Sequence, residues 1–189
     1  MDEPMLPEII EREGFRLRPF RLTDVEAVFT YGSEEQFLRY LPIELPYTHA
    51  TAETFLEKQI QLDRNINPSW AIEMDGAACG GINIRFFADH RVSEIGYGIA
   101  RRLWGRGIVT AASQAVIAAA FGVYPQLERV RARADARNAG SMRVMEKLGM
   151  KREALLRSDR LSRGELRDEV VYGLLRSEWD SLHSREAVM

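Results

Sequence analysis

Cysteine is almost absent from this sequence of 189 residues, which contains only Cys79. One cysteine cannot form an intrachain disulfide, so a fold held together by disulfides is excluded and a reducing compartment fits. Cys79 also lacks a paired His and Asn signature, which favours a structural role over a reactive one. The three histidines are widely scattered without metal-ligand spacing, so no metal is expected.

Long hydrophobic runs are absent as well. The longest apolar stretch, around residues 115–123, is well short of the ~20 residues that a membrane-spanning helix needs. The N-terminal residues 1–8 are acidic and interrupted by proline, the opposite of a secretory signal. We therefore expect a cytoplasmic protein that has no membrane partner.

An excess of charge of one sign is also lacking, because the formal net charge is -2. This balance gives no bulk attraction to nucleic acid, which is not expected as a partner. Apolar residues make up 46% and charged residues 29% of the chain, an ordinary globular composition. The length favours a single domain over residues 1–189, with its core at about residues 14–179.

Alternating apolar and polar residues predict several strands in the first half of the chain, as where Phe15 and Leu17 alternate with arginines. A tight turn at Asp75-Gly76 joins two of them, so consecutive strands form an antiparallel meander. Helices are expected to begin near Thr23 and Thr51, which can act as N-caps. The strands are expected at residues 14–20, 70–74, 78–87 and 92–99.

The second half of the chain changes period. Apolar residues at helical spacing begin at Ile108, and Pro125 ends that helix. A strand at 129–134 then follows, so a strand, a helix and a strand in this order imply a crossover and locally parallel pairing. Asn138 can cap a short helix, and a hairpin covers about 151–175. The fold class is α+β, with a mixed, mostly antiparallel sheet and helices on its faces.

The junction at residues 96–108 carries the most chemical information. A strand ends there, glycines allow backbone N–H groups to approach a ligand, and a long helix begins with unsatisfied donors. These features suit a diphosphate, and three arginines in the segment add positive charge. The spacing matches neither Gly-x-Gly-x-x-Gly nor a P-loop. On spacing alone, a plain strand-to-helix turn remains an equal alternative.

Several motifs in order resemble the GNAT N-acetyltransferases. Arg102, Gly105 and Gly107 match the pyrophosphate loop of that family, Gln/Arg-x-x-Gly-x-Gly/Ala. The segment from Asn138 to Ser141, together with residues 146–150, Glu-Lys-Leu-Gly-Met, is similar to the second motif of that family. The residues at 94–97 and the closing Gly164, Asp168, Tyr172 and Glu178-Trp179 resemble the branch that acetylates N-terminal amines of ribosomal proteins. The resemblance covers about Phe15 to Trp179.

The resemblance implies a six- to seven-stranded GNAT-type sheet and an acetyl-CoA cosubstrate bound where strands 92–99 and 129–134 separate. The backbone near Ile99 and Arg101 should pair with the pantetheine arm. Asn138 corresponds to a residue that contacts the cofactor, although an N-cap role is the commoner one and the two can coexist. The pyrophosphate should be held by the amides of Arg102, Leu103, Trp104, Gly105, Arg106 and Gly107.

The resemblance also implies two catalytic residues. Glu94 is the candidate base for the attacking amine, acting through water, and a solvated strand carboxylate is the alternative. His90 is an alternative base, because the ordinary pKa of histidine lies near neutral pH. Its place in an expected turn favours an exposed surface residue instead. Ser141 matches the residue that serves as proton donor or thiolate contact in the branch. The alternative is a serine at a helix start that only hydrogen-bonds to the backbone. Met145 stands where many family members have a tyrosine donor.

The acceptor is the open question at this stage. A primary amine is expected, either at a protein N-terminus or on a small molecule such as an amino acid, a polyamine or an antibiotic. A module that binds acetyl-CoA without catalysis is a further alternative, and the resemblance is compatible with a homodimer. Four aromatic residues are candidates for the acceptor cleft, with ordinary core packing as the alternative for each: Phe37, Tyr40, Tyr47 and Trp70.

Overall fold

The computed structural model describes residues 5–184, so residues 1–4, half of the acidic N-terminal segment, lie outside it, as do 185–189. Strands β3 (Ser69–Met74), β4 (Ala77–Phe87) and β5 (Val92–Ile99) form the expected antiparallel meander. Strands β1 (Ile10–Arg12) and β2 (Phe15–Arg18) extend it with further antiparallel pairs.

The helices between β2 and β3 begin differently from the expectation. A 3-10 turn, η1 (Leu22–Asp24), precedes α1 (Val25–Gly32), so Thr23 lies inside the turn and is no N-cap. The short α2 (Glu35–Leu38) leads to α3 (His49–Ile60), whose N-cap is Thr48. Thr51, the predicted cap, is instead the third helical residue, and its amide donates to the Thr48 hydroxyl at 3.2 Å.

The second half has the predicted crossover from β5 to a parallel β6. A 3-10 turn, η2 (Arg101–Leu103), connects β5 to α4 (Ile108–Val123). None of the helices within residues 5–184 combines the length and hydropathy of a membrane-spanning helix. The remaining elements are β6 (Arg129–Asp135), α5 (Ala139–Lys147), β7 (Lys151–Ser162), β8 (Glu165–Leu175) and α6 (Arg176–Ser184).

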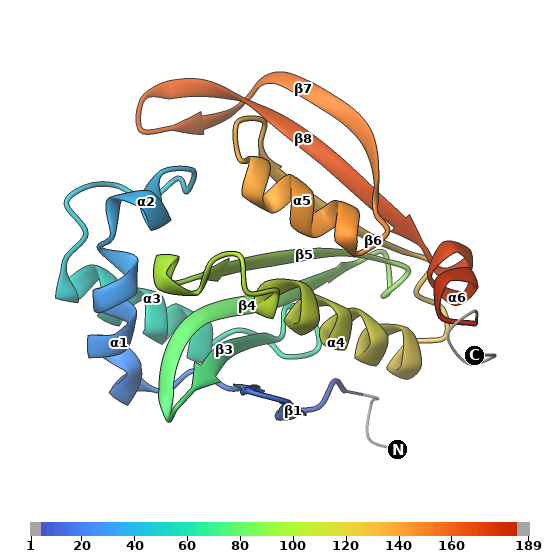
Figure 1. The fold of residues 1–189 in the computed structure, drawn as a ribbon, viewed down its shortest axis with the longest axis horizontal. Helices are drawn as coiled ribbons and strands as arrows, with labels where there is room; N and C mark the ends of the chain where they lie inside the picture. Colours follow the sequence, from blue (N-terminus) through green and yellow to red (C-terminus); the bar gives the residue numbers. More distant parts are fainter. Residues whose placement is uncertain (1–4, 185–189) are drawn as a thin grey trace.

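The eight strands of residues 5–184 form one sheet in the order β1-β2-β3-β4-β5-β6-β8-β7 (Figure 1). The α+β class is confirmed, and the sheet has one strand more than the six to seven expected. The additional strand is β1, which has three residues, too few for a period of two to be detected. It pairs with β2 across a turn in which Gly14 has a φ of 80°.

The two faces of the sheet carry different helices. Gly81 and Gly98, which are register partners, face α1 and α2, since a methyl group at Gly98 would lie 3.2 Å from the Phe37 ring. Alternate residues face the other way, where the Phe86 ring packs 4.8 Å from the ring of Tyr124 at the end of α4. In Figure 1, α1 and α3 lie together at one end of the molecule and α4 runs across the front. The two faces of the central strands are thus covered by different helices.

A buried ion-pair network joins β2, β3 and η1. The Arg18 guanidinium, 2% exposed, donates to both carboxylate oxygens of Asp24 at 2.7 and 2.8 Å and also bonds Glu73. Burial raises the pKa of Glu73, but hydrogen bonds from Arg18 and Arg16 outweigh it and lower that pKa below its ordinary value. The stabilisation from Glu73 is therefore present above its unfolded pKa and is lost as pH falls through the lower folded pKa.

Replacing Arg18 with methionine should lower the free energy of unfolding by about 3–5 kcal/mol, because two buried carboxylates lose their partner. The matched control is Arg16→Met, whose side chain also bonds Glu73 but is 41% exposed, so a loss of about 1 kcal/mol or less is expected. Urea unfolding at pH 7 measures both. Toward acid pH the loss at Arg18 should shrink, because Glu73 no longer needs the guanidinium once pH falls through its lowered pKa. Equal losses at the two arginines would contradict this role.

Candidate functional site

The gap between β5 and β6 is the central feature of the site. Only three residue pairs join the two strands, and the last is Glu94 with Arg131. Beyond that pair β5 stays with β4 up to Ile99, whereas β6 stays with β8 up to Asp135. The strands therefore separate where the family resemblance implies that they should. The edge of β5 from Ile95 onward then faces a gap in place of a neighbouring strand.

The loop from β5 to α4 has the geometry of an anion site. Gly105 and Gly107 both adopt left-handed backbone angles, with φ of 76° and 77°, and Gly107 is the N-cap of α4. No side chain caps this helix, so its first amides remain available to a ligand. Buried Leu103 anchors the loop, and the side chains of Arg102 and Arg106 are exposed beside it.

The two backbone groups expected to bind pantetheine already have partners. The Ile99 carbonyl accepts from the indole Nε1 of Trp104 at 2.9 Å, and the Arg101 amide donates to Oε2 of Glu34 at 3.3 Å. A carbonyl oxygen keeps a second lone pair, whereas an amide has only one hydrogen. Pantetheine could thus share the Ile99 carbonyl, but Glu34 would have to move before it reached the Arg101 amide.

Glu94 lies at the point where the strands separate. Its side chain is half-buried, and Oε2 accepts a hydrogen bond from Nε of Arg131 at 2.8 Å. The guanidinium of Arg131 also lies over the Phe87 ring, with 5.0 Å to the ring centre. Because Glu94, Gly96 and Gly98 alternate along β5, they share one face of the sheet, on the side of α1 and α2. The carboxylate is thus paired, yet close to the gap.

The α5 side of the gap holds Ser141. The Asn138 side chain accepts from the Ser141 amide at 3.1 Å, which is the N-cap role predicted as the commoner one. The Ser141 hydroxyl lies 3.1 Å from the hydroxyl of Tyr97 on β5. Met145 is fully buried in the core, so no donor stands at that position.

Tyr97 is the functional candidate that sequence reasoning missed. Its number appeared only within the motif at 94–97, and its partner Ser141 lies 44 residues further along the chain. Burial raises the pKa of Tyr97 to about 12, although the hydrogen bond to Ser141 lowers it somewhat. The phenol therefore stays protonated and able to donate. The sequence does contain a signal for it. Met145 stands where many family members have a tyrosine, and Tyr97 is another tyrosine in the strand that borders the gap.

A pocket of about 260 Å³ adjoins the gap on the α1–α2 face. Gly96, Tyr97 and Gly98 of β5 form part of its lining, together with residues of α1, α2, α3 and the loop before α3. Of the four aromatic candidates, Phe37 and Tyr47 line this pocket. Trp70 is fully buried and donates to the Pro7 carbonyl at 3.1 Å, so its role is core packing.

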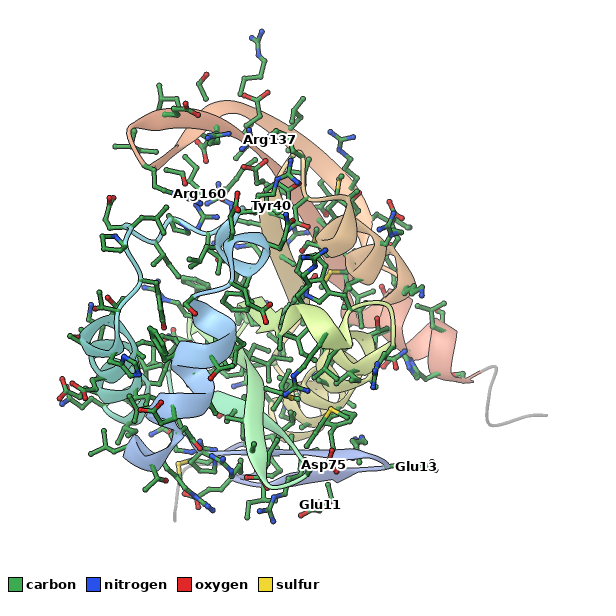
Figure 2. The ribbon with its side chains drawn as sticks, turned by 60° about the vertical axis from the view of Figure 1, so that its left-hand side comes forward. Glu11, Glu13, Tyr40, Asp75, Arg137 and Arg160 are labelled. Carbon is green, nitrogen blue, oxygen red and sulfur yellow. The ribbon has the colours of Figure 1, made fainter. Side chains whose placement is uncertain are left out.

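The β7–β8 hairpin closes the rim of the site. Arg163 in its turn donates to the Leu38 carbonyl at the end of α2 at 2.6 Å, which links the two halves of the chain. Figure 2 shows Tyr40, Arg137 and Arg160 together at this end, between the segment after α2 and the hairpin. Tyr40 thus belongs to the rim and is not part of the pocket lining.

The remaining candidates lie away from this chemistry. His90 is not an exposed surface residue, because its ring stacks on Tyr124 and bonds the Asn65 carbonyl at 2.7 Å. Burial raises the pKa of Cys79 to about 11, which agrees with a structural role. Within residues 5–184, no three His, Cys, Asp or Glu side chains are grouped as a metal site would require.

A divergent strand pair, a glycine-bearing helix start and an adjoining pocket together are the features of a transferase that binds an extended anionic cosubstrate beside an acceptor. The family model described as the acetyltransferase (GNAT) domain matches residues 15–151. The chain belongs to the GNAT acetyltransferase family. It is accordingly an acetyl-CoA-dependent acetyltransferase that transfers acetyl to an amine.

Relatives share most of this architecture. YnaD of Bacillus subtilis (strain 168), named as an N-acetyltransferase, is 28% identical over 164 residues, which cover 87% of this chain and 95% of YnaD. YdaF of the same organism, whose name provisionally assigns it as a ribosomal N-acetyltransferase, is 37% identical over 107 residues, 56% of this chain and 58% of YdaF. A GNAT-family acetyltransferase structure from Bacillus anthracis is 26% identical, with a TM-score of 0.79 over 89% of this chain and 99% of that one.

Proposed function

We propose that this chain binds acetyl-CoA in the gap between β5 and β6 and acetylates a primary amine, the N-terminal amine of a protein. The observation that carries the proposal is the end of β5–β6 pairing at Glu94 and Arg131, directly beside the pocket at Gly96 and Gly98. A thioester in the gap would face an acceptor in the pocket. The cytoplasmic location expected from the sequence remains a prediction.

The cofactor contacts follow from the loop geometry. The amides from Arg102 to Gly107 hold the pyrophosphate, and exposed Arg102 and Arg106 add positive charge. The Ile99 carbonyl and the Arg101 amide pair with pantetheine, and Asn138 holds the start of α5 against the cofactor while capping the helix. Trp104, whose side chain is about half exposed, covers the pantetheine arm.

The reaction forms a carbon–nitrogen bond and breaks the carbon–sulfur bond of the thioester, so CoA leaves as a thiolate. The amine must first lose a proton, because amines of this kind are mostly protonated at neutral pH. Glu94 accepts that proton through a water molecule. Its bond to Arg131 uses Oε2 and leaves Oε1 free for that role.

The leaving thiolate is stabilised by Ser141, and Tyr97 positions Ser141. A phenol of pKa about 12 is a much weaker acid than a thiol of pKa about 8.5, so Tyr97 keeps its proton. The phenol hydrogen has two acceptors in reach, Oγ of Ser141 at 3.1 Å and the Ser141 carbonyl at 3.3 Å. In the proposed arrangement it is donated to Oγ, which leaves the serine hydrogen free to point at the sulfur. Tyr97 and Ser141 together would supply the hydroxyl contact to the leaving thiolate that Met145 cannot supply.

Acetylation of a protein N-terminus is supported by the identity to YdaF over 107 residues. A small-molecule amine is the competing acceptor. CoA release from acetyl-CoA should be followed with peptides bearing free N-terminal amines and with polyamines, amino acids and aminoglycosides. Turnover of peptides above all small amines supports the proposal, and tight acetyl-CoA binding without turnover of any amine would overturn it.

Glu94→Gln should lower kcat about 100-fold or more with little change in KM, because the amide keeps the bond to Arg131 but cannot accept a proton. Arg131→Gln is the matched control, since it removes the other half of the same ion pair while leaving the carboxylate. We expect its kcat to stay within about threefold of the wild type. Steady-state CoA release measures both, and equal losses would assign the pair a structural role only.

Gly107→Val should weaken acetyl-CoA binding about tenfold or more, because a branched side chain disfavours the left-handed backbone and obstructs the approach to the amides. Gly14→Val is the control, with a φ of 80° against 77° and open space around both positions. Both variants carry similar strain, but Gly14 lies far from the gap. Calorimetric titration with acetyl-CoA measures the difference, and an unchanged affinity at Gly107 would refute this phosphate site.

Tyr97→Phe should lower kcat about tenfold, and combining it with Ser141→Ala should cost no more than Ser141→Ala alone, because the tyrosine acts through the serine. Tyr172→Phe is the control, since it also removes a phenol, one bonded to Glu146 at 3.2 Å. Its kcat should be unchanged. Additive losses in the double variant would show that Tyr97 and Ser141 act separately.

A further inference from the structure

The pocket beside the gap has neutral walls. Among the described residues that line it, none is Asp, Glu, Lys, Arg or His. Most of the wall is aliphatic or aromatic, including Val28, Phe37, Leu41, Ile43, Tyr47 and Phe55. Burial raises the pKa of Tyr47 and of the neighbouring Tyr31, so both phenols stay neutral.

The floor of the pocket is backbone. Gly81 and Gly98 face each other across β4 and β5, and Gly96 is the register partner of Asn83. Aromatic rings approach this floor closely, since a methyl group at Gly81 would lie 2.9 Å from the Phe20 ring. Side chains already lie against these glycines, because the Phe20 ring, the Phe37 ring and Oδ1 of Asn83 occupy the space next to Gly81, Gly98 and Gly96. An acceptor group would therefore occupy the remaining pocket volume of about 260 Å³.

The amide and serine side chains in the lining are hydrogen-bonded to each other or to neighbours. Asn83 donates from Nδ2 to Oδ1 of Asn67 at 2.8 Å, and Ser69 donates to Oε1 of Gln59 at 2.6 Å. No carboxylate in the lining is available to pair with a cation. A charged group placed here would lose its hydration without gaining a counter-ion, which is strongly unfavourable.

Charges gather at the rim instead, and they are paired. Arg160 bonds Glu169 at 3.0 Å, and Arg137 bonds Asp135 at 2.6 Å. Glu94 lies at the other boundary, two residues before Gly96 on the same face of β5. An amine near Glu94 would thus have the neutral pocket directly beside it.

We infer that the acceptor carries, next to its primary amine, one neutral apolar group that fills this pocket, and that polyamines and other amines with a second charge close by are rejected. An apolar cavity of roughly 150 Å³ holds a benzene ring. About 260 Å³ thus accommodates one aromatic or branched aliphatic group with its attached carbon. The inference rests on the proposed function, because it assumes that the pocket receives the acceptor.

The test is a panel of acceptors with saturating acetyl-CoA. Tetrapeptides beginning with Leu, Phe, Gly, Lys or Glu are compared with isoamylamine, phenethylamine and spermidine. Apolar first residues or apolar free amines should show kcat/KM about 10- to 100-fold above their small or charged counterparts. Preference for peptides or for free amines identifies the source of the apolar group, and either supports the inference.

Ile43→Asp places a carboxylate in the pocket lining at a partly buried loop position that should tolerate it. It should lower kcat/KM for the best apolar acceptor about tenfold or more, while acetyl-CoA affinity stays unchanged. Ile66→Asp is the matched control, an isoleucine that is 52% exposed and outside the lining, and it should change neither quantity.

The outcomes separate this inference from the proposed function. Fastest turnover of spermidine or of the Lys peptide, or no effect of Ile43→Asp on apolar acceptors, overturns the inference while acetyl transfer stands. If no amine is acetylated although acetyl-CoA binds, the proposed function fails. In that case, calorimetric titration of the acetyl-CoA-loaded protein with phenethylamine and spermidine still decides the inference. Only phenethylamine should bind, and Ile43→Asp should abolish its binding.

Discussion

The separation of β5 from β6 after three residue pairs is the constraint on which the rest of the site depends. Strand backbone groups inside a protein require partners, and β5 beyond Glu94 has neighbours on one side only. An extended ligand with alternating donors and acceptors can complete that edge as a further strand would. On their other edges β5 keeps its pairing with β4 and β6 its pairing with β8 along their full lengths, so two intact parts of the sheet diverge beyond Glu94 and Arg131. The proposed cofactor site would thus depend on backbone geometry before any side chain contributes.

The two faces of β5 divide the chemistry around this gap. Tyr97 points toward α5 and bonds Ser141, so the proposed cofactor side carries two hydroxyl groups. Glu94, Gly96 and Gly98 lie on the face of α1 and α2, so the proposed acceptor side has a carboxylate at one end and, beyond it, glycines covered by the Asn83 and Phe37 side chains. Because successive residues of a strand point to opposite faces, a single strand supplies both sides. Shifting β5 by one residue against β4 would exchange these roles and remove the floor of the pocket.

How much of this could be predicted from the sequence depends on the range of each interaction. The N-cap role of Asn138 can be predicted because a helix cap is a local feature that its residue type favours. The left-handed backbone of Gly107 is likewise a local feature, of a kind that glycine accommodates. The cap of α3 was assigned to Thr51 instead of Thr48, because either threonine of a reciprocal pair satisfies the same local pattern. The bonds from Tyr97 to Ser141 and from Arg163 to Leu38 span 44 and 125 residues, and no local pattern reveals them. The short β1 lacked enough residues to show any period.

The same difference in range explains why the cosubstrate is easier to identify than the acceptor. The groups proposed to hold acetyl-CoA are mostly backbone amides and carbonyls of one continuous segment, and glycines mark where the backbone must be accessible. The proposed acceptor pocket instead takes its walls from α1, α2, α3, the loop before α3, β3, β4 and β5, and Gly96 and Gly98 mark it locally in the sequence. The pocket is neutral because none of the described residues that line it is charged. Charged residues at the rim, such as Arg137 and Arg160, form ion pairs with Asp135 and Glu169. Acceptor selectivity in such a site can change through substitutions in any one wall, while the gap and the helix start remain the same.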